Sequence, residues 1–124
     1  DLFHLVYVCD YYLFSHAGVY QYWMDKYKLD MFQLIIEDFP NYFLEDVSEY
    51  RGGFGLVGSC IWADIRESYN QPLFERSYQI VGHTQLADYP HVGKDIACLD
   101  VRRPFLLEDN VLYDIKDGKK YILR

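Results

Sequence analysis

The chain has 124 residues, enough for one domain with one core, and we treat residues 1–124 as a single unit. Its hydrophobic fraction of 51% and charged fraction of 25% are ordinary for a globular protein. The net charge of −7 leaves no basic excess to release counterions, which excludes nucleic acid as the main partner. No apolar run reaches the roughly 18 residues that span a bilayer, so we expect no membrane partner.

The cysteine and tyrosine contents carry further information. Three cysteines without a Cys-x-x-Cys pair indicate neither a disulfide framework nor a zinc ribbon, so we expect reduced thiols in a cytoplasmic protein. Thirteen tyrosines favour a layered core with a large half-exposed surface, or with a surface that meets a partner. The sequence opens at Asp1 rather than Met, which we interpret as a processed or truncated product.

The N-terminal residues predict a β-hairpin. Residues 4–9 (HLVYVC) are rich in β-branched and aromatic residues and predict a strand. Residues 11–15 (YYLFS) predict a second strand, and Asp10 is a suitable turn residue between them.

Helical patterns follow the hairpin. Residues 19–27 have apolar side chains near helical spacing, and Asp30 is a suitable N-cap for a second helix over residues 31–39. Pro40 is expected to end that helix, and residues 41–50 are expected to hold a further short helix.

The middle of the chain combines a glycine-rich loop with two strands. Residues 51–59 (RGGFGLVGS) contain four glycines in nine positions and lack the ending of a phosphate-binding P-loop. Residues 62–69 are predicted to be irregular or weakly helical. Residues 78–82 and 95–101 predict buried strands.

The last twenty residues predict a β-meander. Its strands are expected over residues 105–107, 111–115 and 119–123, with Asp117-Gly118 as a hairpin signal. Strands, then helices, then strands predict one α/β (α+β) unit.

Two histidines occupy the same kind of position. His16 and His83 each follow a predicted strand and precede small residues, and such strand ends can meet at one edge of a sheet. Neutral imidazole is a good ligand for Mn, Fe, Zn or Ni. The alternative is that both are ordinary hydrogen-bonded boundary residues. His4 and His91 lack this setting and are interpreted as surface residues.

The surrounding motifs resemble a known family. Leu13-Phe14-Ser15-His16-Ala17-Gly18-Val19 and Ile80-Val81-Gly82-His83-Thr84 are similar to the C-terminal metal motifs of calcineurin-like metallophosphoesterases. Residues 59–64 (SCIWAD) resemble the segment before Gly-His-Thr in the protein-phosphatase-like branch. The resemblance covers residues 2–101.

This resemblance implies a fold and a chemistry. The family fold is a β-sandwich flanked by helices, of which this chain would be the C-terminal half. The intact enzyme hydrolyses phosphate esters with water activated by two divalent metal ions (Mn, Fe, Zn or Ni). The resemblance implies that His16 and His83 ligate one of these metals and that Thr84 supports His83. Arg66 is the expected phosphate contact, because a guanidinium binds two oxygens at once, although a surface ion pair is an alternative.

The remaining ligands of the family are absent. The sequence contains no Gly-Asp-x-His, Gly-Asp-x-x-Asp-Arg-Gly or Gly-Asn-His-Glu motif, and Gln85 stands where the family often has Pro. We therefore expect this chain alone to be inactive and to hold no metal stably. We expect it to pair with its own N-terminal half or with another copy.

Two functions remain open at this stage. One is a fragment of a phosphatase that acts on a phosphorylated substrate: a phosphoprotein, a dinucleoside polyphosphate or a small phosphomonoester. The alternative is a non-catalytic binding or assembly module that retains the phosphatase scaffold. A third interpretation is a small α+β domain whose motif matches arise by chance.

Overall fold

The computed structural model of the protein describes residues 4–74 and 78–123. The ends of the expected unit, residues 1–3 and 124, and the segment 75–77 lie outside the described residues. The first sheet has the order β1-β2-β3-β5-β4, with the strands β1 (Val6–Cys9), β2 (Tyr12–Ser15), β3 (Tyr78–Val81), β4 (His91–Val92) and β5 (Ile96–Cys98). The second has the order β6-β7-β8, with the strands β6 (Phe105–Glu108), β7 (Val111–Asp114) and β8 (Lys120–Ile122).

The predicted N-terminal hairpin is confirmed. Strands β1 and β2 pair antiparallel from Val6–Ser15 to Cys9–Tyr12, which leaves Asp10 and Tyr11 as a two-residue turn. Asp10 has a left-handed φ of 52°, a conformation that aspartate tolerates better than most residues. The hairpin strands therefore begin at Val6 and Tyr12, slightly later than the sequence pattern indicates.

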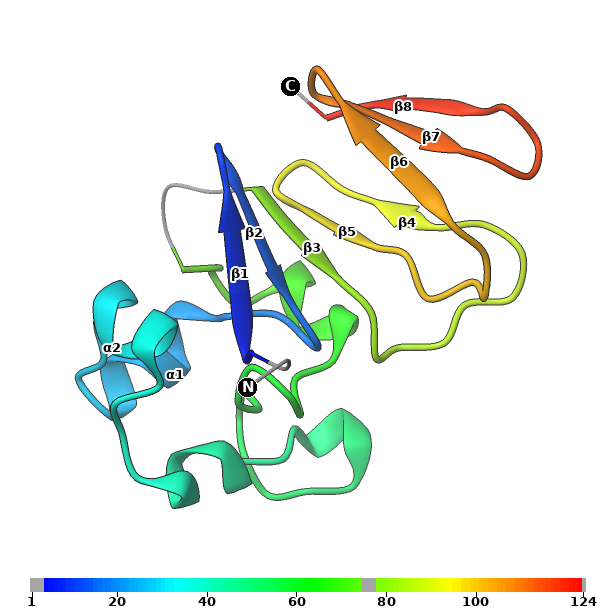
Figure 1. The fold of residues 1–124 in the computed structure, drawn as a ribbon. Helices are drawn as coiled ribbons and strands as arrows, with labels where there is room; N and C mark the ends of the chain where they lie inside the picture. Colours follow the sequence, from blue (N-terminus) through cyan, green and yellow to red (C-terminus); the bar gives the residue numbers. More distant parts are fainter. Residues whose placement is uncertain (1–3, 75–77, 124) are drawn as a thin grey trace.

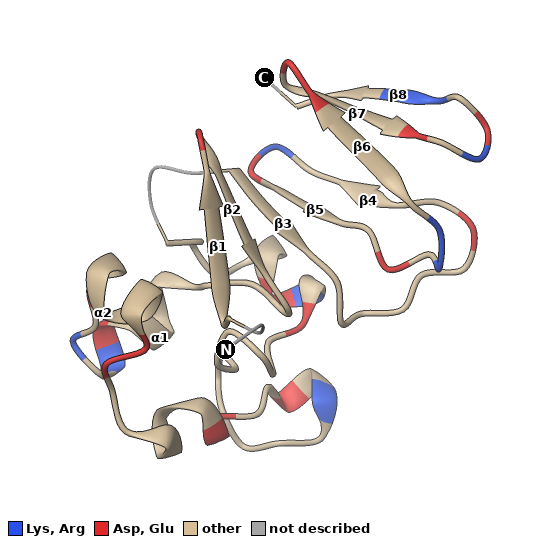
Figure 2. Ribbon diagram, viewed as in Figure 1, with Lys and Arg blue, Asp and Glu red and all other residues tan. Residues whose placement is uncertain are grey.

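The three central strands separate two layers of the molecule. Strand β2 runs parallel to β3, and β3 runs parallel to β5. Figure 2 shows that β2, β3 and β5 carry no charged residue, as expected for strands covered on both faces. Side chains alternate along β2, so that Leu13 packs toward the helices and Tyr12 toward the second sheet.

The two sheets pack against one another through an apolar cluster. The first sheet contributes Tyr12, Tyr78, Ile80 and Ala97, and Leu112 of β7 meets them from the meander. In Figure 1 the meander β6–β8 and the helices α1 and α2 lie on different sides of the five-stranded sheet. The mixed α/β class predicted from the sequence is confirmed, with two sheets and few helices.

The two α-helices are shorter than their patterns indicate. Helix α1 spans Gln21–Lys26, and helix α2 spans Met31–Ile36. The Asp30 N-cap is confirmed, because its side chain accepts from Gln33 N–H and the Gln33 side chain returns to the Asp30 backbone. The predicted end at Pro40 is wrong. Glu37 adopts a left-handed conformation with φ of 58° and closes the helix before the proline is reached.

Short 3₁₀ helices replace the further helix expected over residues 41–50. Helices η1 (Asn41–Glu45) and η2 (Glu49–Arg51) flank an extended break, and η3 (Ile65–Tyr69) lies in the segment predicted to be weakly helical. The glycine-rich loop between η2 and η3 is confirmed as a loop. Gly58 is essential to its path, since an added Cβ would overlap the backbone carbonyl of Trp62.

The C-terminal meander is confirmed, with one change at its second turn. Five residues, 115–119, connect β7 to β8, so Asp117-Gly118 does not form a two-residue hairpin turn. Asp114 accounts for the longer loop. Its buried carboxylate accepts from Lys116 N–H at 3.0 Å and pairs with Arg103 Nη2 at 2.7 Å.

Candidate functional site

Neighbouring parallel strands bring the two predicted histidines together. His16 follows β2 directly, and His83 lies two residues beyond β3. Because β2 and β3 are adjacent and parallel, their carboxyl ends lie at the same edge of the sheet. His16 Nε2 lies 2.8 Å from His83 Nδ1, and the ring centroids are 4.6 Å apart. The structure thus places two imidazoles where one small ligand can contact both.

The spacing of the two nitrogens is close to that of two ligands bound to one metal ion. Two imidazole nitrogens at about 2.0–2.1 Å from one tetrahedral metal lie about 3.3 Å apart. The observed distance of 2.8 Å corresponds to a hydrogen bond between the rings. Moving the rings about 0.5 Å apart would give the nitrogen spacing that one shared metal ion requires. The arrangement is therefore suited to two ligands of one ion, while ligation itself stays a prediction.

His83 has an unusual backbone and an unpaired nitrogen. Its φ of 67° is left-handed, which is uncommon outside glycine, although histidine, asparagine and aspartate adopt it several-fold more often than other residues. Its Nε2 is buried and has no hydrogen-bond partner within the described part of the chain. Burial lowers the pKa of His83, and the nearby Arg51 and His16 lower it further. These effects favour neutral imidazole, which is the form that binds metals.

The segment that follows each histidine is fixed by hydrogen bonds. Gly82 N–H donates to the His16 carbonyl at 3.0 Å, which joins the two motifs directly. Thr84 Oγ1 accepts from Ile65 N–H at 3.2 Å and so ties the residue after His83 to η3. The Cys98 thiol donates to the carbonyls of Gly82 and Thr84, at 3.4 and 3.3 Å. The support of His83 through Thr84 that the resemblance implies is therefore compatible with the contacts.

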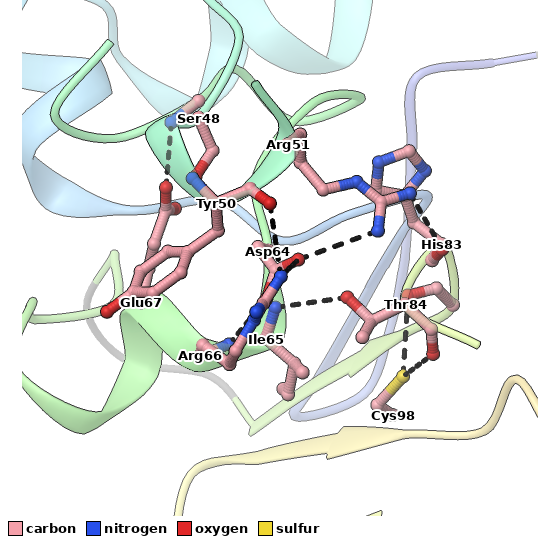
Figure 3. A network of polar contacts seen from close by, with 12 residues as sticks. Ser48, Tyr50, Arg51, Asp64, Ile65, Arg66, Glu67, His83, Thr84 and Cys98 are labelled. Atoms are coloured by element: carbon pink, nitrogen blue, oxygen red, sulfur yellow. Dashed lines mark hydrogen bonds and ion pairs between the residues drawn. The ribbon is translucent and has the colours of Figure 1, made fainter. Parts of the chain in front are cut away.

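Arg51 is the cation that sequence reasoning missed. It ends η2, and its Nη2 donates to the His83 carbonyl oxygen at 3.3 Å. Its Nη1 lies 3.5 Å from Asp64 Oδ2, and its side chain is 28% exposed. Figure 3 shows Arg51 reaching toward His83 and Asp64. The only signal in the sequence is that a cation stands directly before the glycine-rich loop.

Arg66, the predicted phosphate contact, is paired instead with Asp64. Its Nε and Nη2 lie 2.8 and 3.0 Å from the two carboxylate oxygens, and its Nη2 also donates to the Tyr50 carbonyl. Its guanidinium lies 4.7 Å from the centre of the Tyr50 ring. Asp64 is fully buried, and although burial raises its pKa, the hydrogen bonds from Arg66 hold the pKa below its ordinary value. A phosphate contact by Arg66 stays a prediction, but the arginine that contacts His83 is Arg51.

The other histidines and the tryptophan have different surroundings. The edge of Trp62 meets the His83 ring, with centroids 5.6 Å apart and planes at 90°. His4 is exposed and contacts Glu37 at 3.2 Å. The His91 ring packs against Tyr69 at 5.9 Å. Neither His4 nor His91 joins the pair.

Among the described residues, no group of three or more His, Cys, Asp or Glu side chains is arranged to hold a metal ion. His16 and His83 are two candidate donors, and ligation by this pair stays a prediction. Within the same residues, no helix is both long and apolar enough to cross a membrane. No protein-family model matches the sequence, and neither a curated protein nor a solved structure matches it.

Proposed function

We propose that this chain supplies two imidazole ligands to the centre of a metal-dependent phosphoesterase. The observation that carries the proposal is the contact of 2.8 Å between His16 Nε2 and His83 Nδ1 at the ends of two adjacent parallel strands. The two motifs that resemble the metallophosphoesterase family contain these same histidines. The family resemblance and the geometry both involve this pair.

The chemistry assigned to this centre is hydrolysis of a phosphate ester. When bound, divalent metal ions lower the pKa of a water molecule and polarise the phosphoryl oxygens. His16 and His83 orient their imidazoles toward one another, and burial favours the neutral form of His83. Arg51 places a guanidinium beside His83, where it can donate to a phosphate oxygen. Arg51 therefore takes the role that the sequence analysis gave to Arg66.

Two ligands do not complete such a centre. Zinc in proteins takes three or four protein ligands, and two-metal sites need bridging carboxylates as well. In this proposal the missing donors come from a partner segment, which is the N-terminal half of the domain or another chain. The 124 residues alone then show little or no phosphatase activity.

The isolated chain is expected to hold no metal stably, but weak and reversible binding is measurable and tests the proposal. Titration with Zn²⁺, followed by NMR of the imidazole nitrogens, is expected to shift the resonances of His16 and His83 together. His83→Ala should abolish the shift at His16, because a single exposed imidazole holds the ion far more weakly than a pair. The matched control is His4→Ala, which removes a histidine outside the pair and should leave both shifts unchanged. Equal zinc affinity in the parent chain, His16→Ala and His83→Ala would refute the assignment.

An assembly module is the second candidate, and a different observation favours it. Large apolar side chains are exposed on the hairpin and on α2, including Tyr7 at 64%, Phe32 at 67% and Ile36 at 50%. Exposed apolar surface of this kind is typical of protein contacts. Sedimentation at micromolar concentration tests this candidate: a module of this type self-associates or binds a partner without metal. A monomer at all concentrations counts against self-association.

A further inference from the structure

One buried carboxylate serves two guanidinium groups beside the histidine pair. Asp64 is fully buried at the start of η3 and has Arg66 on one side and Arg51 on the other (Figure 3). A buried carboxylate needs a cation and hydrogen bonds to offset its lost hydration. How the two arginines share this requirement determines which of them is available to a ligand.

The two arginines contribute unequally. Arg66 contacts both oxygens of Asp64, at 2.8 and 3.0 Å, and its own backbone N–H adds a third contact at 2.9 Å. Arg51 contacts only one oxygen, at 3.5 Å, which exceeds the usual length of a hydrogen bond. Arg66 therefore satisfies the carboxylate, and Asp64 holds the Arg51 guanidinium only loosely.

We propose that Asp64 and Arg66 form a positioning pair that keeps the Arg51 guanidinium available to a phosphate group beside His83. Arg51 is the group that touches the phosphate, whereas Arg66 acts through Asp64 and makes no contact with the ligand. This inference rests on the proposed function, because it names a phosphate group as the ligand. It also assigns Arg66 a role different from the phosphate contact expected from the sequence.

The pair is needed because of the position of Asp64. Without the charge of Arg66, the buried carboxylate remains uncompensated, and the nearest alternative cation is Arg51 at 3.5 Å. Arg51 then moves into close contact with Asp64 and is withdrawn from the ligand. A change at Arg66 thus removes phosphate binding although Arg51 is still present.

The experiment measures inorganic phosphate binding to the 124-residue chain by NMR, with the Arg51 Nε–Hε resonance as the reporter. Arg51→Gln should weaken binding roughly tenfold, the loss of one charge-assisted hydrogen bond. Arg66→Gln keeps a hydrogen-bond donor for Asp64 but removes the charge, and it should weaken binding by a similar factor. In the same variant, slower exchange of the Arg51 Nε–Hε proton should report its closer contact with Asp64. Arg66→Lys restores the charge and should recover most of the affinity.

The double variant separates an indirect role of Arg66 from a direct one. If Arg66 acts only through Arg51, Arg66→Gln added to Arg51→Gln causes no further loss. Additive losses would overturn the inference, because they indicate that Arg66 touches the phosphate itself. Unchanged affinity in Arg66→Gln would also overturn it, as would no measurable phosphate binding by the parent chain. If Arg66→Gln does not fold, Arg66→Lys is combined with Arg51→Gln in its place. The inference holds that a positive charge at position 66 is sufficient, so loss of Arg51-dependent phosphate binding in Arg66→Lys would contradict it. The zinc titration does not depend on these arginines, so the proposed function can stand if this inference fails.

Discussion

The buried amide of Gln79 fixes the backbone just after His16. Gln79 lies on β3 and is fully buried; its Oε1 accepts from Val19 N–H at 2.8 Å and its Nε2 donates to the Val19 carbonyl at 2.7 Å. Gln79→Leu keeps the approximate size of the side chain and removes both bonds. The Val19 carbonyl retains a partner, because Phe74 N–H donates to it at 2.9 Å. The Val19 N–H is left buried without an acceptor.

The magnitude follows from these contacts. An unsatisfied buried N–H costs about 1–3 kcal/mol, and the second hydrogen bond contributes about 1 kcal/mol. Burial of the leucine side chain offsets part of this loss, so the free energy of unfolding should fall by about 2 kcal/mol. The segment that carries His16 should loosen at the same time, because Val19 lies three residues beyond it.

Two measurements check this prediction. Urea unfolding gives the change in stability, and hydrogen exchange shows whether the Val19 amide loses protection. Gln85→Leu is the matched control, since Gln85 is exposed and its replacement should change stability by less than about 0.5 kcal/mol. A Gln79→Leu chain that loses no more than its control, with Val19 still protected, would refute the reasoning.

Two further predictions concern the glycine-rich loop. Glu67 is buried, its Oε2 has no hydrogen-bond partner among the residues that the structure describes, and burial raises its pKa above 4.5. Protonation of Glu67 adds to the free energy of unfolding. This contribution is fully present below about pH 4.5 and is lost as the pH rises through the raised pKa. Glu67→Gln should remove this decline in stability. If the urea midpoints of parent and variant change with pH in the same way from pH 4.5 to 8, the prediction is contradicted. Gly58→Ala should destabilise the chain by about 1–3 kcal/mol, because the added Cβ overlaps the Trp62 carbonyl. Gly82→Ala, whose added Cβ meets only the His16 carbonyl at 3.8 Å, should lose clearly less in the same urea assay.

Elements with local signals are the ones that the sequence predicts well. The hairpin β1–β2, the Asp30 cap and the meander each depend on contacts between residues close in the chain. The pairing of β2 with β3 joins residues more than sixty positions apart, and no local pattern indicates it. Strand β4 has only two residues, too few for an alternating pattern to be visible. Helix α2 ends at the left-handed Glu37, because a C-terminal cap can precede the proline that follows.

Only part of the candidate site can be predicted from the sequence. The meeting of His16 and His83 follows from the rule that ligand sites lie at the carboxyl ends of parallel strands. Arg51 is brought to His83 by the path of the glycine-rich loop, which sequence spacing does not reveal. The Arg66 guanidinium can bind two oxygens at once, and in the structure it binds the two oxygens of Asp64. The Asp-x-Arg spacing was the available signal, because Asp64 caps the turn that contains Arg66.

The local strain at His83 bears on why this position holds a histidine. A left-handed φ in a residue other than glycine and an unpaired buried nitrogen are both unfavourable, the second by about 1–3 kcal/mol. Asparagine tolerates the same backbone, but it has no ring to pack against Trp62 as the His83 imidazole does. Contacts through Gly82, Thr84 and Arg51 hold the residue in this conformation nevertheless. An ion shared with His16 would bind His83 at Nδ1 and leave Nε2, on the other side of the ring, without a partner among the described residues, so the cost at Nε2 neither supports nor opposes the proposed metal half-site.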